Sequence, residues 1–590
     1  MDIRNKPEEC GVDSRIPAPG QLAESPFRTL DHTKEAWIAR ATGGLSPAAL
    51  ALAIADWFIH LLVAPGKQVE LAMLAVCQSR RLLEDACGGA PLQAGLPSDD
   101  RFPGAVWQVA PFSIWQRAFR LTEQWWHVAT HETPGASRHH EDVISFTARQ
   151  WLDVLSPSNY PLTNPEVIER TAATLGANLV VGSWNALEDA WRAGTGQPPT
   201  GAKRFRPGVE VAVTPGNVVF RNHLIELIQY APLTADVAAE PILIVPAWIM
   251  KYYILDLSPH NSLIRYLIGQ GYTVFCISWR NVDEKDRDLG LEDYRRLGVM
   301  GALDAISRIA PEHKIHAAGY CLGGTLLAIA AAEMGNGKDE RLASITLFAA
   351  QTDFSEPGEL QLFIDESQIY FLESLMWERG YLGGDKMAGS FQLLQSNDLV
   401  WSRGIRDYLL GERAPMSDLM AWNADATRLP YRMHSEYLRK LFLQNDLACA
   451  RYEANGRPVS LRNIRTPMFV VGTECDHIAP WRSVYKIHYL CDTDITFVLT
   501  SGGHNAGIVS EPGHLNRNFR INSTAADSLT VGPEEWMARA ESREGSWWPA
   551  WSQWLDAHCL EKRIKPPYMG WPKAEGSILA DAPGTYVLQK

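Results

Sequence analysis

One short stretch of the chain has the residue types and spacing of a covalent catalyst. The sequence HAAGYCLGGTL (residues 316–326) places Cys321 between Gly319 and Gly323, each two positions away. This spacing is typical of a nucleophile elbow, a sharp strand-to-helix turn with a strained backbone, here with sulfur in place of the usual serine oxygen. A Cβ at either glycine would collide across that turn. Cys321 is therefore predicted to be a nucleophile; the alternative is a buried structural cysteine in a tight turn.

A thiol nucleophile needs a base, and the base needs an acid to orient it. Both follow apolar runs that are typical of strands: Asp476 comes after PMFVVG (467–472), and His504 comes after ITFVLT (495–500). In α/β-hydrolases the order along the chain is nucleophile, acid, histidine, each at the carboxyl end of a strand. Cys321, Asp476 and His504 follow this order, which predicts a catalytic triad.

Each assignment of the acid and the base has an alternative. Asp476 could cap a helix that begins near Pro480, and His504 could be an ordinary loop histidine. Glu474 is a competing acid. His477 is a competing base, but it directly follows the acid and does not occupy the loop after the last strand. It is therefore interpreted as a neighbour of the site.

Backbone N–H groups near the nucleophile are predicted to form an oxyanion hole. One N–H belongs to Leu322, directly after Cys321. The other belongs to Trp248 or Ile249, in the loop after the apolar run PILIVP (241–246). Such groups stabilise the negative charge that develops on a carbonyl oxygen during acyl transfer.

A largely parallel sheet is predicted to position these residues. Apolar runs bounded by turn residues alternate with helical segments at 241–246, 272–278, 314–319, 343–349, 467–472 and 495–500. Apolar strands separated by helices indicate a sheet that is covered on both faces. A mainly helical, aromatic insertion at about 354–460 is expected to cover the site as a cap. The predicted class is α/β, with an α/β-hydrolase fold and a helical cap insertion.

The rest of the chain is predicted to divide into three further parts. Residues 1–45 are expected to be a flexible segment, 46–193 a helical domain, and 194–208 a linker rich in Gly, Pro and basic residues. The catalytic domain is then 209–590. Within it, VEVAV and NVVFRN on either side of Thr214-Pro215-Gly216 suggest a hairpin. Because the triad lies beyond the linker, the helical domain is expected to take no part in bond making and to serve dimer stability or contacts with partners instead.

Composition excludes several classes of protein. A formal net charge of −13 argues against a nucleic-acid partner. Nine scattered cysteines show neither a disulfide framework nor metal-ligand spacing, so no metal is predicted and a reducing cytoplasm is expected. The most apolar helix, at about 48–64, contains Asp56 and His60 and is too short to span a bilayer, so no transmembrane segment is predicted.

The sequence resembles the class I poly(3-hydroxyalkanoate) synthases over most of its length. The segments that carry the resemblance are RQWLDVLSPSNYPLTNPEV, VEVAVTPGNVVFRNHLIELIQY, VPAWIMKYYILDLSPHNSLIRYLIGQGYTVFCISWRN, GYCLGGTL, LMAWNADATRLP, GTECDHIAPW and SGGHNAGIV. The resemblance implies that Cys321 is acylated, that His504 is its base, and that Asp476 supports His504 and helps to activate the incoming hydroxyl.

The same resemblance implies the substrate, product and partners. The substrate would be an (R)-3-hydroxyacyl-coenzyme A, so that coenzyme A is part of the substrate and no separate cofactor is expected. The product would be a polyester that collects in cytoplasmic granules. The partners would be the growing chain, the granule surface, granule-associated proteins and a second copy of the chain in a homodimer.

Two positions depart from the family pattern P-P-W-I-N-K, because Ala247 and Met250 replace a proline and an asparagine. Met250, His477 and Trp422 are the candidate substrate-binding residues. The alternative functions are a cysteine-dependent α/β-hydrolase, of the thioesterase or dienelactone hydrolase type, and a non-catalytic granule-surface protein. Cysteine at the elbow favours acyl transfer, because a thioester keeps the acyl group activated until a hydroxyl arrives.

Overall fold

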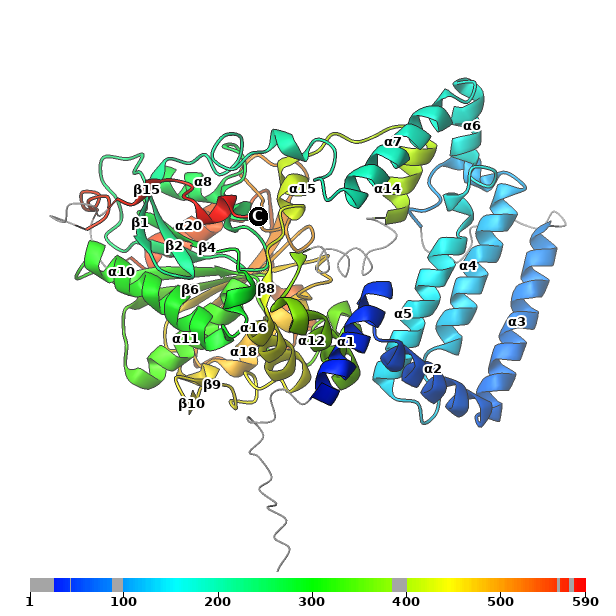
Figure 1. The fold of residues 1–590 in the computed structure, drawn as a ribbon, viewed down its shortest axis with the longest axis horizontal. Helices are drawn as coiled ribbons and strands as arrows, with labels where there is room; N and C mark the ends of the chain where they lie inside the picture. The colour runs from blue at the N-terminus through cyan, green and yellow to red at the C-terminus, as the bar shows by residue number, and fades with distance from the viewer. Residues whose placement is uncertain (1–25, 43, 87–98, 385–399, 560–562, 572–577) are drawn as a thin grey trace, which may run out of the picture.

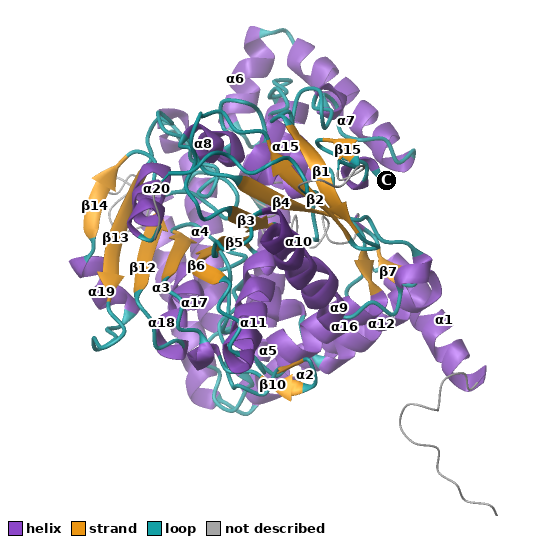
Figure 2. Cartoon of the chain, turned by 90° about the vertical axis from the view of Figure 1, so that its left-hand side faces the viewer, coloured by secondary structure: helices purple, strands orange, loops and turns teal. Residues whose placement is uncertain are grey.

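A twisted mixed sheet forms the centre of the catalytic region. The computed structural model describes residues 26–42, 44–86, 99–384, 400–559, 563–571 and 578–590. Within them the sheet has eleven strands in the order β14-β13-β12-β11-β6-β5-β3-β4-β2-β1-β15. Figure 2 shows these strands with helices on both faces. Their bounds are β1 (Gly216–Arg221), β2 (Ile225–Tyr230), β3 (Ile242–Val245), β4 (Val274–Trp279), β5 (Ile315–Tyr320), β6 (Leu342–Phe348), β11 (Met468–Thr473), β12 (Ile495–Thr500), β13 (Asn518–Thr524), β14 (Glu541–Glu544) and β15 (Ala580–Asp581).

The α/β class is confirmed, and the sheet is parallel in its six central strands but antiparallel in the strands on either side of them. The six predicted runs form β3, β4, β5, β6, β11 and β12, which pair with one another in parallel. Their side chains are almost all buried, as expected for strands that are covered on both faces. Antiparallel strands flank them on both sides. The carboxyl ends of β5, β11 and β12 therefore meet at one edge of the sheet.

The predicted hairpin at Thr214-Pro215-Gly216 is wrong. VEVAV forms no strand, and β1 pairs instead with β2. The side chain of Asn222 explains this turn, because its Oδ1 accepts hydrogen bonds from the N–H groups of Leu224 (2.8 Å) and Ile225 (2.9 Å).

Helices pack on both faces of the sheet and over its carboxyl edge. Their bounds are η4 (Tyr252–Asp256), α8 (Leu263–Gly269), η5 (Glu284–Asp286), α9 (Leu291–Asp293), η6 (Tyr294–Met300), α10 (Gly301–Ile309), α11 (Leu322–Gly337), η11 (Leu461–Asn463), α17 (Trp481–Tyr485), α18 (Ile487–Leu490), α19 (Pro533–Arg539), α20 (Trp548–Ala557) and η12 (Tyr586–Leu588). The central helix is α11, which follows the elbow and is buried along most of its length.

The insertion between β6 and β11 is mainly helical in its described part. It contains η7 (Glu359–Phe363), α12 (Glu366–Arg379), α14 (Ser402–Gly404), η9 (Ile405–Leu409), α15 (Asp418–Asn423), α16 (Tyr431–Glu436) and η10 (Tyr437–Leu443), with two small ladders, β7 (Tyr381–Leu382) with β8 (Leu429–Pro430) and β9 (Glu453–Ala454) with β10 (Arg457–Pro458). We call this segment, 354–460, the cap insertion.

A separate group of helices precedes the sheet. It comprises α1 (Pro26–Ala41), α2 (Pro47–Leu62), α3 (Pro65–Ala86), η1 (Ala105–Gln108), α4 (Phe112–Ala129), α5 (Arg138–Leu155), η2 (Pro157–Asn159), α6 (Pro165–Ala173) and α7 (Ala177–Gly194), with η3 (Ala202–Arg204) in the predicted linker. Figure 1 shows α2 to α7 beside the catalytic region. Ser46 caps α2 by accepting the N–H of Ala49, ahead of a proline in the first turn.

The structure corrects the boundary of the predicted flexible segment. Residues 26–41 form α1, which packs against α12 of the cap insertion (Figure 1). Ala36 and Ala39 are buried, and the ring of His32 hydrogen-bonds to the hydroxyl of Ser374 over 2.9 Å. Residues 1–25 lie outside the described residues.

A second contact joins the helical group to the cap insertion. Helix α7 lies against η9, where Asn178 donates a hydrogen bond of 2.8 Å to the carbonyl of Leu409. The two backbones approach so closely that a Cβ at Gly182 would lie 1.8 Å from the carbonyl oxygen of Tyr408. The first helix of the helical group, α1, and its last helix, α7, therefore both contact the cap insertion.

No single described helix is both long and apolar enough to cross a membrane. Helices α2 and α3 pass this test only when they are taken together, and the chain bends by 90° between them.

The close contact between Gly182 of α7 and the backbone of Tyr408 in η9 can be tested by substitution. Changing Gly182 to Ala should push α7 away from η9 and weaken this contact by about 1–3 kcal/mol, as overpacking does. Hydrogen exchange should then become faster by about tenfold or more in residues 402–413. Gly194→Ala is the matched control. Gly194 is the last residue of the same helix, and a Cβ there would meet nothing within 4 Å. Equal exchange in the two variants would contradict the prediction.

Candidate active site

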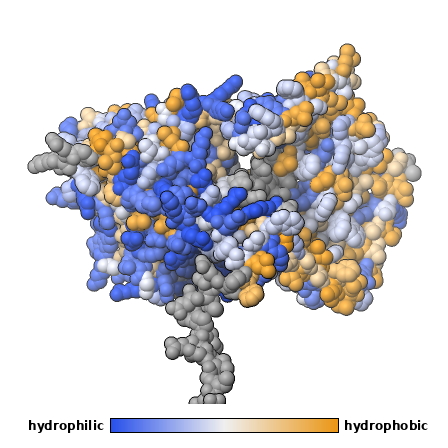
Figure 3. All heavy atoms as spheres, in the orientation of Figure 1, coloured by the Kyte–Doolittle hydropathy of each residue, from blue (hydrophilic) through white to orange (hydrophobic). Residues whose placement is uncertain are grey.

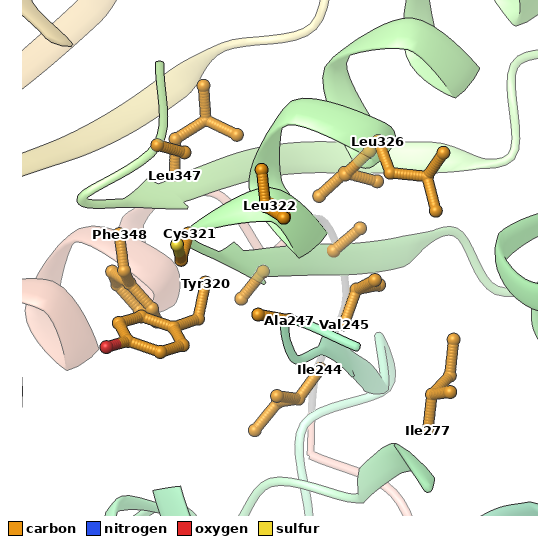
Figure 4. Close-up of a cluster of buried hydrophobic side chains, with 14 of the residues drawn as sticks. Ile244, Val245, Ala247, Ile277, Tyr320, Cys321, Leu322, Leu326, Leu347 and Phe348 are labelled. Atoms are coloured by element: carbon orange, nitrogen blue, oxygen red, sulfur yellow. The ribbon is translucent and has the colours of Figure 1, made fainter. Parts of the chain in front are cut away.

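The backbone at Cys321 has the strained conformation that the elbow requires. Its φ is 53° and its ψ is −125°, between the end of β5 and the start of α11. Figure 4 shows the sulfur at this junction. A Cβ at Gly319 would lie 2.4 Å from the Cα of Gly324, so this glycine is needed across the turn. A Cβ at Gly323 would instead lie 2.1 Å from the carbonyl oxygen of Val245, so this glycine is needed for packing against the end of β3.

Asp476 and His504 lie beside each other at the ends of neighbouring strands. Nδ1 of His504 is 2.7 Å from Oδ2 of Asp476. Cys321 lies close enough to the ring of His504 to raise its pKa. The structure thus brings the three predicted triad residues together. Of the competing groups, Glu474 is exposed and His477 is partly exposed. The carboxylate that contacts His504 is that of Asp476.

The carboxylate of Asp476 is fixed by more than its contact with His504. The hydroxyl of Thr473 donates to its Oδ2 (3.1 Å), and the N–H groups of Ile478 (2.9 Å) and Ala479 (2.8 Å) donate to its Oδ1. Burial raises the pKa of Asp476, but the charge and hydrogen bond of His504 and these N–H groups outweigh it. The pKa therefore lies below its usual value, and the group is an anion.

The surroundings of His504 favour its protonated form. Burial lowers its pKa, but the neighbouring Asp476 and Cys321 raise it more, through their charges and hydrogen bonds. The net pKa lies well above the usual value for histidine. The ring of Tyr320 packs at 5.5 Å from that of His504 and limits its movement. A base in this setting can take the proton of a thiol and keep it.

A cavity of about 100 Å³ opens at Cys321. Most of its wall is apolar and comes from the cap insertion. The lining residues are Trp248, Ile249, Cys321, Leu322, Thr325, Ala349, Gln351, Phe354, Leu360, Phe363, Ile364, Leu372, Leu429, Met433, His434, Tyr437, Leu438, Phe442, Ile478 and Ala479. The sulfur of Cys321 therefore faces a small apolar space under the cap insertion.

The three predicted oxyanion residues all line this cavity. The N–H of Leu322 lies in the first turn of α11, where no partner exists within the helix. Trp248 and Ile249 follow β3, and Thr427 holds both of their carbonyl groups. The hydroxyl of Thr427 donates to the carbonyl of Trp248 (2.5 Å), and its N–H donates to the carbonyl of Ile249 (3.2 Å). Bonds to these carbonyls fix the loop that carries the two N–H groups.

The three candidate substrate-binding residues are not among those that line the cavity. Met250 forms a bridge with Ala426, and Trp422 is buried and donates a hydrogen bond of 2.8 Å to the carbonyl of Lys251. His477 lies next to the acid of the triad. These residues surround the loop after β3 and the loop after β11, and their role stays a prediction.

Three polar residues of the cavity were missed by the sequence analysis. Gln351 is buried, and its Nε2 has no hydrogen-bond partner among the described residues. Burial lowers the pKa of His434 to about 4, so its ring is neutral. Burial, with a smaller contribution from Cys321, raises the pKa of Tyr437. Of the three, only Gln351 could have been expected at the site from the sequence, because it lies two residues after the predicted strand 343–349.

The other described cysteines have different surroundings. Burial raises the pKa of Cys276 well above its usual value and that of Cys491 to about 12. Cys475 is exposed on the loop that carries Asp476. Cys10 and Cys87 lie outside the described residues.

Family comparisons agree with this architecture. Residues 25–67 match the family model "Poly-beta-hydroxybutyrate polymerase N terminal", residues 98–267 match "Poly-beta-hydroxybutyrate polymerase (PhaC) N-terminus", and residues 240–511 match "alpha/beta hydrolase fold". The predicted α/β-hydrolase fold with a helical amino-terminal region is confirmed.

Curated relatives match over most of the chain. A poly(3-hydroxyalkanoate) polymerase of Methylorubrum extorquens is 41% identical over 84% of this chain and 81% of its own. The poly(3-hydroxyalkanoate) polymerase subunit PhaC of Rhizobium meliloti is 38% identical over 83% and 79%, and that of Cupriavidus necator is 34% identical over 90% and 89%. The chain therefore belongs to the poly(3-hydroxyalkanoate) polymerase family, a family of acyltransferases.

Proposed function

We propose that this enzyme joins (R)-3-hydroxyacyl units from coenzyme A thioesters into polyhydroxyalkanoate and releases coenzyme A. The intermediate is an acyl group on the sulfur of Cys321. The observation that carries this proposal is the position of Cys321, on a strained elbow, beside His504 and open to the cavity.

In the first half-reaction His504 accepts the proton of the Cys321 thiol. The sulfur attacks the thioester carbonyl, and the N–H groups of Leu322 and of Trp248 or Ile249 stabilise the oxyanion. The carbon–sulfur bond to coenzyme A then breaks, and the leaving thiolate takes the proton from His504. One thioester replaces another, so the acyl group stays activated.

In the second half-reaction the hydroxyl of another unit or of the growing chain attacks the acyl group on Cys321. His504, with its charge stabilised by Asp476, removes the hydroxyl proton as the ester bond forms. The sulfur of Cys321 leaves and regains that proton from His504. The chain is one unit longer and the enzyme is restored.

The apolar lining of the cavity supports transfer over hydrolysis. Its largely apolar wall would keep water away from the acyl-enzyme and leave an attacking hydroxyl to be delivered by the substrate. A cysteine hydrolase with the same triad would release free acid. A non-catalytic granule-surface protein would have no need for a strained nucleophile.

We also propose that Gln351 binds the 3-hydroxyl group of the substrate. Its buried amide faces an apolar cavity beside the nucleophile, and a buried donor without a partner is costly unless a ligand satisfies it. His434 and Tyr437 offer further polar atoms on the same wall.

The helical group supports a location at the polyester granule in the cytoplasm. Exposed apolar side chains gather on α2 and α3, and Figure 3 shows a broad hydrophobic surface on this side of the molecule. Prominent among them are Leu52, Phe58, Ile59, Leu62, Met73 and Val76. We propose that this surface contacts the growing polyester or granule-associated proteins, and that the enzyme acts as a homodimer.

Replacing Cys321 with Ala should abolish both coenzyme A release and polymer, by at least about 10⁴-fold, because no covalent intermediate forms. The purified chain is given 3-hydroxybutyryl-coenzyme A, and thiol release and polymer are followed together. Cys475→Ala is the control, since this exposed thiol lies on the loop that carries Asp476. Polymer from Cys321→Ala would exclude the mechanism, and thiol release with free acid from the unmodified enzyme would identify a hydrolase.

Replacing Asp476 with Asn should separate the two half-reactions. A thiol is far more acidic than an alcohol, so acylation needs the carboxylate less than elongation does. We expect one equivalent of coenzyme A to be released in a burst, while elongation falls by about 10²–10⁴-fold. Rapid-quench measurement of thiol and polymer checks this. Equal losses in the burst and in elongation would remove the separate role of Asp476.

Replacing Gln351 with Met should slow acylation by 3-hydroxybutyryl-coenzyme A by up to about tenfold, the value of one hydrogen bond. Acylation by butyryl-coenzyme A, which lacks the hydroxyl, should change little. The rate of coenzyme A release in a single turnover measures both. If both substrates slow down equally, Gln351 does not recognise the hydroxyl group.

A further inference from the structure

A second cluster of reactive side chains lies far from the triad. Glu240 stands just before β3, His316 is the second residue of β5, and Cys559 follows α20. One potential ligand atom from each lies within 4.8 Å of the others. Parallel pairing of β3 with β5 brings the first two together, since Ile242 is paired with His316. We propose that Glu240, His316 and Cys559 bind a divalent transition-metal ion, with zinc as the expected metal.

The distances fit such an ion. Nε2 of His316 and Sγ of Cys559 are 3.7 Å apart. Zinc bonds of about 2.3 Å to sulfur and about 2.0 Å to nitrogen, at a tetrahedral angle, would separate these two atoms by about 3.6 Å. The two side chains therefore stand at the spacing of ligands that share one ion.

The surroundings of His316 prepare it as a ligand. Its Nδ1 is 2.7 Å from the hydroxyl of Ser344 on the neighbouring strand β6, and both residues are buried. When Nδ1–H donates to this hydroxyl, the lone pair of Nε2 points to Cys559, which is the arrangement that holds metal-binding histidines.

The donor set selects the class of metal. Oxygen, nitrogen and sulfur together suit zinc and similar ions, whereas magnesium and calcium prefer oxygen alone. Binding would displace the proton of the Cys559 thiol into the solvent. The charges of Zn²⁺, the thiolate and the carboxylate would then sum to zero, which lowers the cost of burying them. Cys559 is only partly buried, which leaves a path for the ion.

The proposed site would be structural. His316 lies in β5, and Cys321 directly follows the end of that strand. At the usual rise per residue the two residues are about 16 Å apart, so the ion would not touch the reacting atoms. It would tie the end of α20 to the first residues of β3 and β5. The ligands are separated by long stretches of sequence, which is why the spacing of the cysteines gave no sign of a metal.

Metal analysis tests this proposal without reference to catalysis. The untagged full chain, purified without chelators and incubated with Zn²⁺, should retain about one zinc ion per chain after desalting. Cys559→Ala should retain less than a tenth of this amount. Cys491→Ala, which removes another buried thiol, should retain all of it. Less than a tenth of a zinc ion per unmodified chain, or equal zinc in all three proteins, would overturn the proposal.

Cobalt provides a second readout that does not depend on any substitution. Co²⁺ bound at the site should show a thiolate charge-transfer band in the near ultraviolet, which zinc should abolish by competition. The band should be missing in Cys559→Ala and present in Cys491→Ala. Cobalt bound without a thiolate band would mean that Cys559 is not a ligand, and would also overturn the proposal.

Discussion

The backbone at Cys321 is the constraint on which the site depends. A residue other than glycine at φ 53° and ψ −125° is strained, and such strain persists only where the surroundings enforce it. Here the N–H of Cys321 is held by the carbonyl of Phe348 on β6, and Gly319 and Gly323 allow the contacts that no side chain would permit. This turn points the sulfur away from the sheet, toward His504 and the cavity. Because β5, β11 and β12 are parallel, the loops with Asp476 and His504 end at the same edge.

The second half of the site is built by the cap insertion. Its side chains close the cavity, and Thr427 fixes the loop that carries Trp248 and Ile249. The cap insertion is itself held by α1 at α12 and by α7 at η9. The helical group thus contacts the segment that lines the cavity at Cys321, although it contributes no residue to the predicted triad.

The sequence was most informative where a polar residue directly follows an apolar strand in the chain. The six apolar runs predicted the parallel strands, and the residues after them predicted which side chains meet at the edge of the sheet, because strand, turn and side chain are adjacent in the chain. The hairpin was misplaced because the side chain of Asn222, not Pro215 with Gly216, makes the turn. Helix α1 was missed because its few buried residues gain their burial from α12, more than 300 positions away. The polar residues Gln351, His434 and Tyr437 of the cavity wall were missed for the same reason, because they meet only in the folded chain.

The proposed mechanism requires the sulfur of Cys321 to carry an acyl group, either a single unit or a short chain, during turnover. The most direct measurement is a peptide map of the unmodified enzyme, quenched with acid within one turnover of 3-hydroxybutyryl-coenzyme A and analysed by mass spectrometry. The account predicts 3-hydroxybutyryl groups, singly or in short chains, on the peptide that contains Cys321 and on no other cysteine peptide. An acyl group on a different residue, or polymer formed with no acylated peptide at any time, would contradict it.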